Sequence, residues 1–206
     1  MSLLRKIRRF IERKETAAVT RDRRKLFLEP LEPRILLSAD LKFAMTGTAD
    51  DLTLRLDNED GAEVLNLINN DDLSILLSQT LDETSAVEIT GSDDADILTI
   101  DFGHGSLLET LPISFLDSFI GDSDTLRIIG TDSIWNITGA DEGAMKNVDF
   151  FGIENLVGGG GDDELIGPDT PNIWQITGQD EGILNGRIGF SGIENLTGGS
   201  ENDTFR

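Results

Sequence analysis

One segment of this chain occurs twice, and the spacing of the two copies limits what the chain can fold into. The residues SIWNITGADEGAMKNVDFFGIENLVGGGGDDELIG recur further along as NIWQITGQDEGILNGRIGFSGIENLTGGSENDTFR. Trp135 aligns with Trp174 at an offset of 39 residues, and Gly152 aligns with Gly192 at an offset of 40 after one insertion. Such a period is typical of stacked supersecondary units, none of which can bury its apolar face alone.

Each copy reads as a series of short strands separated by turns. An alternating W-x-I-T strand comes first, followed by a Gly-x-Asp-Glu-Gly turn, a variable strand, F-x-G-I-E-N-L and a glycine-rich acidic turn. Alternation with a period of two favours strands over helices. An aspartate standing two residues before an apolar position recurs along the chain, at Asp96/Leu98, Asp124/Leu126, Asp163/Leu165 and Asp203/Phe205.

The region upstream of the copies also reads as strands. Between Leu41 and Val87 the short runs LKFAM, LTLRL, EVLNL, LSILL and AVEIT are punctuated by turn residues, although Leu73–Leu77 is also compatible with one helical turn. We therefore predict an all-β fold from about Ala39 onward, with parallel β-solenoid or β-roll-like repeats. Antiparallel hairpins at the Gly-x-Asp-Glu-Gly turns are an open alternative, because 40 residues exceed one ordinary solenoid turn.

Two pairs of equivalent side chains have structural roles in this prediction. Trp135 and Trp174 are expected to pack between repeats rather than to form a platform for a ligand. Asn155 and Asn195 are expected to form a stacked amide ladder.

Charge divides the chain into two parts. The whole chain carries a net charge of -22. Residues 1–34 contain 11 basic and 5 acidic side chains and are net basic by 6, so the remainder carries a net charge of -28. Such a concentration of carboxylates is destabilising unless solvent, salt or bound cations offset it, and it repels nucleic acid. The absence of cysteine excludes disulfides and thiolate metal sites.

The basic part predicts a leader. Residues 1–25 read as a short amphipathic helix or a disordered tail, which could contact an anionic membrane surface or secretion machinery. Its apolar residues do not form a run long enough to span a bilayer or to act as a conventional signal peptide.

Residues 26–40 contain LEPLEPRILLSAD, which resembles the LEPR-XLL motif found near the amino termini of very large repetitive bacterial surface proteins. The matching residues are Leu31, Glu32, Pro33, Arg34, Leu36 and Leu37. This resemblance implies export. We divide the rest of the chain into a β-rich region with degenerate repeats, 41–130, and two repeats of about 40 residues, 131–206, the second of them truncated.

The glycine-rich turn of the first copy suggests calcium binding. Calcium takes six to eight oxygen ligands, which a tight turn can supply through glycine carbonyls and a following carboxylate. The segment GGGGDDELI, residues 158–166, matches the nonapeptide G-G-x-G-x-D-x-U-x and so resembles RTX-type calcium-binding repeats. The resemblance implies a parallel β-roll, with Leu165 in the core and metal ligands at Gly158, Gly159, Gly161 and Asp163. The second copy is similar through Gly198, Gly199 and Asp203, although Glu201 stands where the family has glycine.

These features predict an exported calcium-binding structural or adhesin-type protein rather than an enzyme. The chain would be the amino-terminal fragment of a larger bacterial surface protein, extracellular or on the cell surface, with calcium ions and cell-surface or matrix components as partners. His104 is the only histidine, lies between glycines and is expected to be a loop residue, and no acid belongs to a recognised catalytic pair. The alternative is a fragment of a carbohydrate-active β-helical enzyme.

Overall fold

The computed structural model describes residues 39–118 and 121–206. These residues form strands and short 3₁₀ helices, which confirms the all-β prediction. The leader, 1–25, and the six residues that match the LEPR-XLL motif lie outside the described residues. The 3₁₀ helices are η1 (Leu81–Glu83), η2 (Phe102–His104) and η3 (Ser106–Thr110). Within the described part of the chain, no helix is long and apolar enough to cross a bilayer.

The strands form two large mixed sheets. In order across the sheet, the eight-stranded sheet contains β1 (Ala39–Ala44), β5 (Thr84–Thr90), β7 (Ile113–Leu116), β11 (Val148–Phe151), β10 (Glu142–Met145), β9 (Ile134–Ile137), β13 (Glu164–Ile166) and β17 (Asn195–Thr197). In the same way, the ten-stranded sheet contains β18 (Thr204–Phe205), β14 (Ile173–Gly178), β15 (Glu181–Leu184), β16 (Ile188–Ser191), β12 (Asn155–Val157), β8 (Thr125–Ile129), β6 (Ile97–Asp101), β2 (Asp51–Glu59), β3 (Ala62–Asn69) and β4 (Ile75–Thr80).

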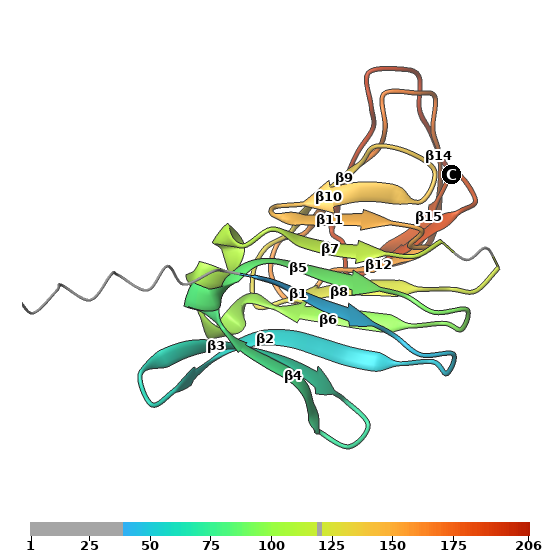
Figure 1. Ribbon diagram of the computed structural model, residues 1–206. Helices are drawn as coiled ribbons and strands as arrows, with labels where there is room; N and C mark the ends of the chain where they lie inside the picture. Colours follow the sequence, from blue (N-terminus) through green and yellow to red (C-terminus); the bar gives the residue numbers. More distant parts are fainter. Residues whose placement is uncertain (1–38, 119–120) are drawn as a thin grey trace, which may run out of the picture. The chain divides into compact units, whose positions relative to one another are not determined.

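The chain passes repeatedly from one sheet to the other, so strands that are distant in sequence pair in parallel (Figure 1). In the ten-stranded sheet, β2, β6, β8, β12 and β16 lie side by side in sequence order. One apolar residue from each strand is in register with the next, in the order Leu52, Leu98, Leu126, Leu156 and Phe190. Parallel pairing of large apolar residues therefore extends across these five strands.

Antiparallel hairpins are inserted into this parallel arrangement, and they explain the long sequence period. In the first copy β9, β10 and β11 form an antiparallel meander, as do β14, β15 and β16 in the second. The antiparallel hairpins that the sequence left open as an alternative at the Gly-x-Asp-Glu-Gly turns are therefore present. Trp135 lies in the eight-stranded sheet and Trp174 in the ten-stranded sheet, so equivalent segments of the two copies occupy opposite sheets.

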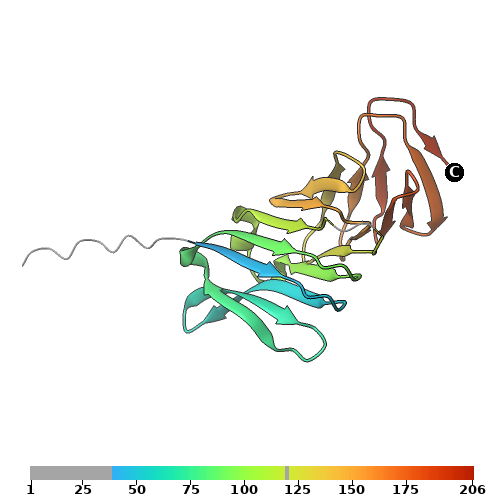
Figure 2. The same cartoon turned by 45° about the vertical axis from the view of Figure 1, so that its right-hand side comes forward.

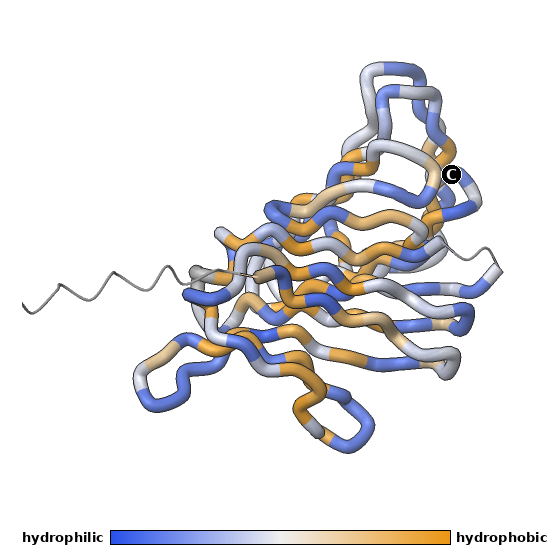
Figure 3. The backbone as a smooth tube through the Cα atoms, viewed as in Figure 1, coloured by the Kyte–Doolittle hydropathy of each residue, from blue (hydrophilic) through white to orange (hydrophobic). Residues whose placement is uncertain are grey.

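Apolar side chains alternate with polar ones along the strands, as the orange and blue segments of Figure 3 show. On β2, for example, Leu52, Leu54 and Leu56 are fully buried and contribute to one core cluster that draws on both sheets. Trp135 and Trp174 are also fully buried. Each indole packs edge-on against a phenylalanine of its own meander, at centroid distances of 6.1 Å in both copies. The tryptophans thus pack in the core, each against its own copy, whereas packing between the repeats stays a prediction.

The hairpin of β3 and β4 lies at the end of the ten-stranded sheet opposite to β18 and is seen from another side in Figure 2. Its turn is held by the side chains of Asn69 and Asp72, which accept hydrogen bonds from the backbone N–H groups of Asp71 and Ser74. Leu73 adopts a left-handed conformation with φ of 60°. The helical alternative for Leu73–Leu77 is therefore wrong, because these side-chain bonds close a hairpin turn and the following residues pair with β3.

The recurring aspartates bond the backbone of the neighbouring strand. Asp96 Oδ1 accepts a hydrogen bond of 2.8 Å from the N–H of Asp50, and Asp124 Oδ1 accepts one of 2.8 Å from the N–H of Asp96. Glu154 Oε2 continues the series by accepting from the N–H of Asp124 at 3.1 Å. Because the donors are buried or partly buried and would otherwise lack a partner, these carboxylates stabilise the stacking of the strands.

The same arrangement recurs around the glycine-rich turns. Asp163 accepts from the N–H of Ser133 at 2.7 Å, and Asp203 accepts from the N–H of Asn172 at 2.9 Å. The aspartate two residues before an apolar side chain is therefore a capping residue at all four positions predicted to be equivalent.

The expected amide ladder of Asn155 and Asn195 is wrong. Asn155 lies on β12 in the ten-stranded sheet, whereas Asn195 lies on β17 in the eight-stranded sheet. Each side chain instead donates to a backbone carbonyl of the neighbouring strand, Asp124 O at 3.2 Å and Asp163 O at 3.3 Å. The two amides cannot stack because the copies that contain them alternate between sheets.

Removing one capping carboxylate tests its contribution. Asp96 is fully buried and also accepts from the N–H of Ser92, so Asp96→Ala leaves two backbone donors without their partner. We expect the free energy of unfolding, measured by urea denaturation, to decrease by about 2–4 kcal/mol, at roughly 1–3 kcal/mol per unsatisfied buried donor. The exposed Asp94→Ala is the control. Equal stability of the two variants would contradict the capping role.

Candidate metal centre

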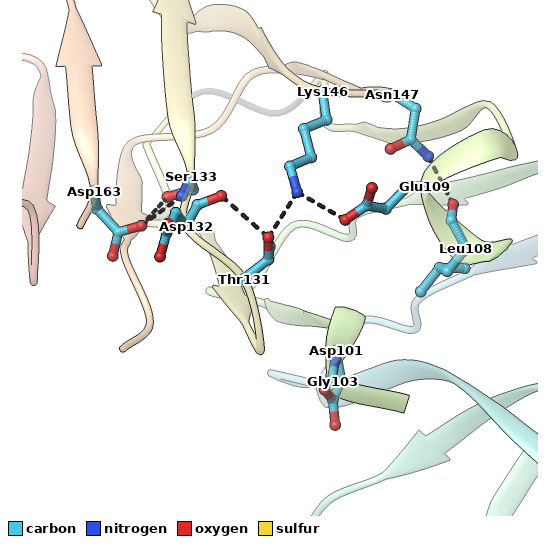
Figure 4. A network of polar contacts seen from close by, with 10 residues as sticks. All are labelled: Asp101, Gly103, Leu108, Glu109, Thr131, Asp132, Ser133, Lys146, Asn147 and Asp163. Atoms are coloured by element: carbon cyan, nitrogen blue, oxygen red, sulfur yellow. Dashed lines mark hydrogen bonds and ion pairs between the residues drawn. The ribbon is translucent and has the colours of Figure 1, made fainter. Parts of the chain in front are cut away.

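The predicted ligand Asp163 lies at the start of β13 and is fully buried. Its Oδ1 accepts hydrogen bonds from the backbone N–H of Ser133 at 2.7 Å and from the Ser133 hydroxyl at 2.6 Å (Figure 4). Its Oδ2 has no hydrogen-bond partner. One carboxylate oxygen of Asp163 is thus already hydrogen-bonded to Ser133, and the other is not.

The predicted glycine ligands lie where backbone and carboxylates approach closely. A Cβ atom at Gly158 would collide with the carbonyl oxygen of Gly192 and would lie 2.6 Å from Asp163 Oδ2, and one at Gly159 would lie 2.6 Å from Ile128 O. Gly161 has a backbone φ of 138°, which residues with a side chain rarely adopt. Packing alone therefore requires glycine here, and binding of calcium by these residues stays a prediction.

The second copy of the turn repeats this packing. A Cβ atom at Gly198 would collide with the carboxylate of Asp203, and one at Gly199 would collide with Pro168 O. Glu201 does not have the positive φ that Gly161 has in the first copy. The turn therefore forms in spite of the missing glycine, with Asp203 bonded to the N–H of Asn172.

A lysine supplies positive charge close to the first turn. Lys146 Nζ donates to Glu109 Oε1 at 2.8 Å and to Thr131 Oγ1 at 2.6 Å, as Figure 4 shows. The same ammonium lies 5.5 Å from the ring centroid of Phe102. Lys146 also lines a hollow of 600 Å³ together with Asp132, Asn136, Asp162, Glu164, Ile134 and Asn195.

His104 ends the short helix η2 and is exposed. Its Nδ1 lies 3.0 Å from Asp101 Oδ2, the side chain that also accepts from the N–H of Gly103. The histidine therefore belongs to a surface turn, as its place between glycines predicted.

A second group of acids lies where the chain crosses from β7 to β8. Asp117 directly follows β7, and Asp122 and Asp124 precede β8. One carboxylate oxygen from each of these three residues lies within 4.8 Å of the other two. This acidic cluster, Asp117, Asp122 and Asp124, has the oxygen ligands that hard divalent cations prefer and could hold a metal ion.

Burial gives the acidic cluster unusual electrostatics. Asp124 is fully buried, and although its Oδ1 accepts from the N–H of Asp96, its Oδ2 has no hydrogen-bond partner. Neither carboxylate oxygen of Asp122 has one. Burial, together with the charges of Asp117, Asp122 and Asp96, raises the pKa of Asp124 to about 7. A cation at this position would favour the charged form that burial disfavours.

Further acids surround a hollow beside the cluster. This hollow has a volume of 540 Å³ and is lined by Asp117, Ser118, Ala140, Asp141, Glu142, Phe151, Gly152, Glu154 and Arg187. Burial is the main cause that raises the pKa of Glu154, with smaller contributions from the charges of Asp141 and Asp122. Arg187 forms a bidentate ion pair with Asp141. Negative charge therefore dominates this side of the molecule.

Sequence reasoning identified Asp124 only as one of the aspartates that recur two residues before an apolar position, and it missed Asp117 and Asp122. The signal was nevertheless present, because the segment DSFIGDSD contains three aspartates within eight residues around a glycine. Gly121, which lies between Asp117 and Asp122 in the sequence, has φ of 117°, a conformation that favours glycine.

The comparisons with known proteins found no match for this chain. No protein-family model matches the chain. No curated protein and no solved structure matches it either. The likeness to LEPR-XLL and RTX-type proteins therefore stays an expectation based on the residues that carry it.

The packing role of the predicted glycine ligands can be separated from ion binding. In the presence of a chelator, Gly158→Ala is expected to lower the free energy of unfolding by about 1–3 kcal/mol, because the added methyl group is forced against the backbone. Gly160→Ala is the matched control, since nothing lies within 4 Å of a Cβ atom there. Full stability of Gly158→Ala in chelator, with loss of calcium binding, would show that this glycine serves an ion instead.

The raised pKa of Asp124 predicts a pH dependence of stability without metal. The pKa rises from the ordinary 3.8 to about 7 in the folded chain. Between these values the folded state binds more protons than the unfolded state, so the free energy of unfolding decreases as pH rises. We expect the melting temperature in chelator to fall across this range and Asp124→Asn to reduce the fall, since asparagine can still accept from the N–H of Asp96.

The control for this experiment is Asp149→Asn, which removes the same charge from an exposed position on β11. If both variants follow the wild-type slope, burial of the Asp124 carboxylate does not govern the pH dependence.

Proposed function

We propose that this chain is part of an exported, calcium-binding repeat protein of structural or adhesin type, in which the strands form a parallel β-solenoid. The alternation of the chain between two sheets supports this proposal, as does the parallel register of β2, β6, β8, β12 and β16. Trp135 pairs with Leu165, 30 residues later in the chain, and Trp174 pairs with Phe205, 31 residues later. Both separations are compatible with one solenoid turn that includes an inserted hairpin.

The observation that carries calcium binding is the fully buried Asp124, whose Oδ2 has no hydrogen-bond partner and whose carboxylate belongs to the acidic cluster with Asp117 and Asp122. A buried carboxylate without a counter-charge is strongly destabilising. Calcium suits the site better than magnesium, because it accepts irregular sets of oxygen ligands whereas magnesium requires near-ideal octahedral geometry and retains its water.

A bound ion would connect β7 in one sheet with β8 in the other, since its ligands come from both ends of the crossover. The ion would also offset part of the net charge of -28 carried by residues 35–206. A fold that depends on calcium in this way suits the extracellular space, where modules bind calcium with dissociation constants of about 10⁻⁴–10⁻³ M. Export is supported by the resemblance to the LEPR-XLL motif, and the partners would be components of a cell surface or matrix.

Calorimetric titration with calcium tests this function. We expect saturable binding to the full chain and a rise in unfolding free energy of about 2.7 kcal/mol at a free calcium concentration of 100 times the dissociation constant. Asp122→Asn should abolish binding at the acidic cluster, and because neither Asp122 oxygen accepts a hydrogen bond, the variant should remain folded.

Two further variants identify the site. Asp149→Asn should bind calcium normally, because this exposed residue lies outside the cluster. Loss of calcium binding in Asp163→Asn but not in Asp122→Asn would show that the ion binds at the nonapeptide turn instead of the acidic cluster. Absence of heat and of any thermal shift up to roughly 10 mM calcium, well above the range of extracellular modules, would refute calcium binding.

A further inference from the structure

The duplication has produced two similar acidic hollows. The hollow beside the cluster, here called the first hollow, contains Asp141 and Glu142 of the Gly-x-Asp-Glu-Gly turn. The second hollow has a volume of 300 Å³ and contains the equivalent Asp180 and Glu181, 39 residues later. Each also includes the glutamate of the G-I-E-N-L segment, Glu154 in the first and Glu194 in the second.

The backbone around the acids is bonded in the same way in both hollows. Asp141 O accepts from the N–H of Ile153 at 3.2 Å, and Asp180 O accepts from the N–H of Ile193 at 3.1 Å. Glu142 and Glu181 each lie against the first glycine of their turn. The two hollows therefore present the same pair of acids from the same local framework.

The first hollow already binds a guanidinium group. Arg187, in the turn between β15 and β16 of the second copy, donates from Nε to Asp141 Oδ1 at 2.9 Å and from a terminal nitrogen to Asp141 Oδ2. Lys146, in the corresponding turn of the first copy, pairs with Glu109 at 2.8 Å. In both copies, a basic residue of the second meander turn thus binds an acid that precedes it in the chain.

The second hollow has no such partner among the described residues, where no lysine or arginine forms an ion pair with Asp180, Glu181 or Glu194. Its remaining lining is apolar and open to solvent, with Ile176 45% and Phe205 51% exposed. Acids beside exposed apolar and aromatic groups suit an arginine, whose methylene stem packs on apolar surface while the guanidinium pairs with carboxylates.

We propose that the second hollow binds an arginine side chain presented by a β-turn of a partner repeat protein, in the way that the first hollow binds Arg187. The expected partner has a basic turn flanked by strands. It would approach the second hollow at the end of the sheets where β17 and β18 are the edge strands. This assembly surface goes beyond the proposed calcium function and does not depend on it.

The test uses the full chain in chelator, so that failure of calcium binding does not affect the result. The probe is N-acetyl-arginine methylamide, and its neutral control is the citrulline analogue, which has the same shape without the charge. In amide-detected NMR titrations the arginine probe should give saturable shifts at Gly182 and its neighbours and bind about tenfold more tightly than the citrulline probe. Asp180→Asn should weaken arginine binding by a similar factor, whereas Asp149→Asn should not.

Removing the internal arginine provides a second, independent readout. Arg187 occupies only the first hollow, so Arg187→Gln should add a second binding site for the arginine probe, detected at Gly143. Equal binding of the arginine and citrulline probes would overturn the proposal, as would shifts scattered over the acidic surface without saturation. If the first hollow of Arg187→Gln does not bind the arginine probe, the contact of Arg187 with the first hollow is no guide to what the second hollow binds.

Discussion

Carboxylates that accept hydrogen bonds from the backbone of a neighbouring strand hold this structure together. Asp96, Asp124 and Glu154 each accept from the N–H group of the residue stacked before them, in one continuous series. Parallel strands need such groups at the crossovers, where the ladder of backbone hydrogen bonds is interrupted. The pattern of an acid two residues before a buried apolar side chain therefore meets two requirements. The acid completes the hydrogen bonding of the backbone, and the apolar side chain fills the core.

The capping carboxylates also concentrate negative charge. In the acidic cluster, the repulsion between these charges destabilises the fold. Asp124 uses one oxygen as a cap, while the other is buried without a hydrogen-bond partner, and the Asp124 carboxylate belongs to the cluster with Asp122 and Asp117. The raised pKa of Asp124 expresses the cost of keeping that group charged. A cation offsets the cost without disturbing the cap. The proposed calcium binding thus follows from the capping that stacks the strands. Basic side chains such as Arg187 and Lys146 offset charge at other acids.

Local patterns in the sequence were sufficient for part of this structure. The period-two alternation predicted β2, β3 and β5, the burial of both tryptophans followed from their place in the repeats, and the recurring aspartates marked the capping positions. The assignment of copies to sheets was not predictable in this way, because a strand pattern does not say which sheet the strand joins. That is why the amide ladder of Asn155 and Asn195 was wrong. The cluster was missed because the spacing of acids along a sequence does not show which carboxylates lie close together in space.

A crystal structure determined from calcium-containing solution, with anomalous diffraction data to locate the ion, tests the central claim most directly. The account predicts an anomalous peak bound by Asp117, Asp122 and Asp124 at calcium–oxygen distances of about 2.3–2.6 Å, with Asp124 still accepting from the N–H of Asp96. A cluster without any peak, in crystals grown at saturating calcium and with ions bound only elsewhere on the chain, would contradict it.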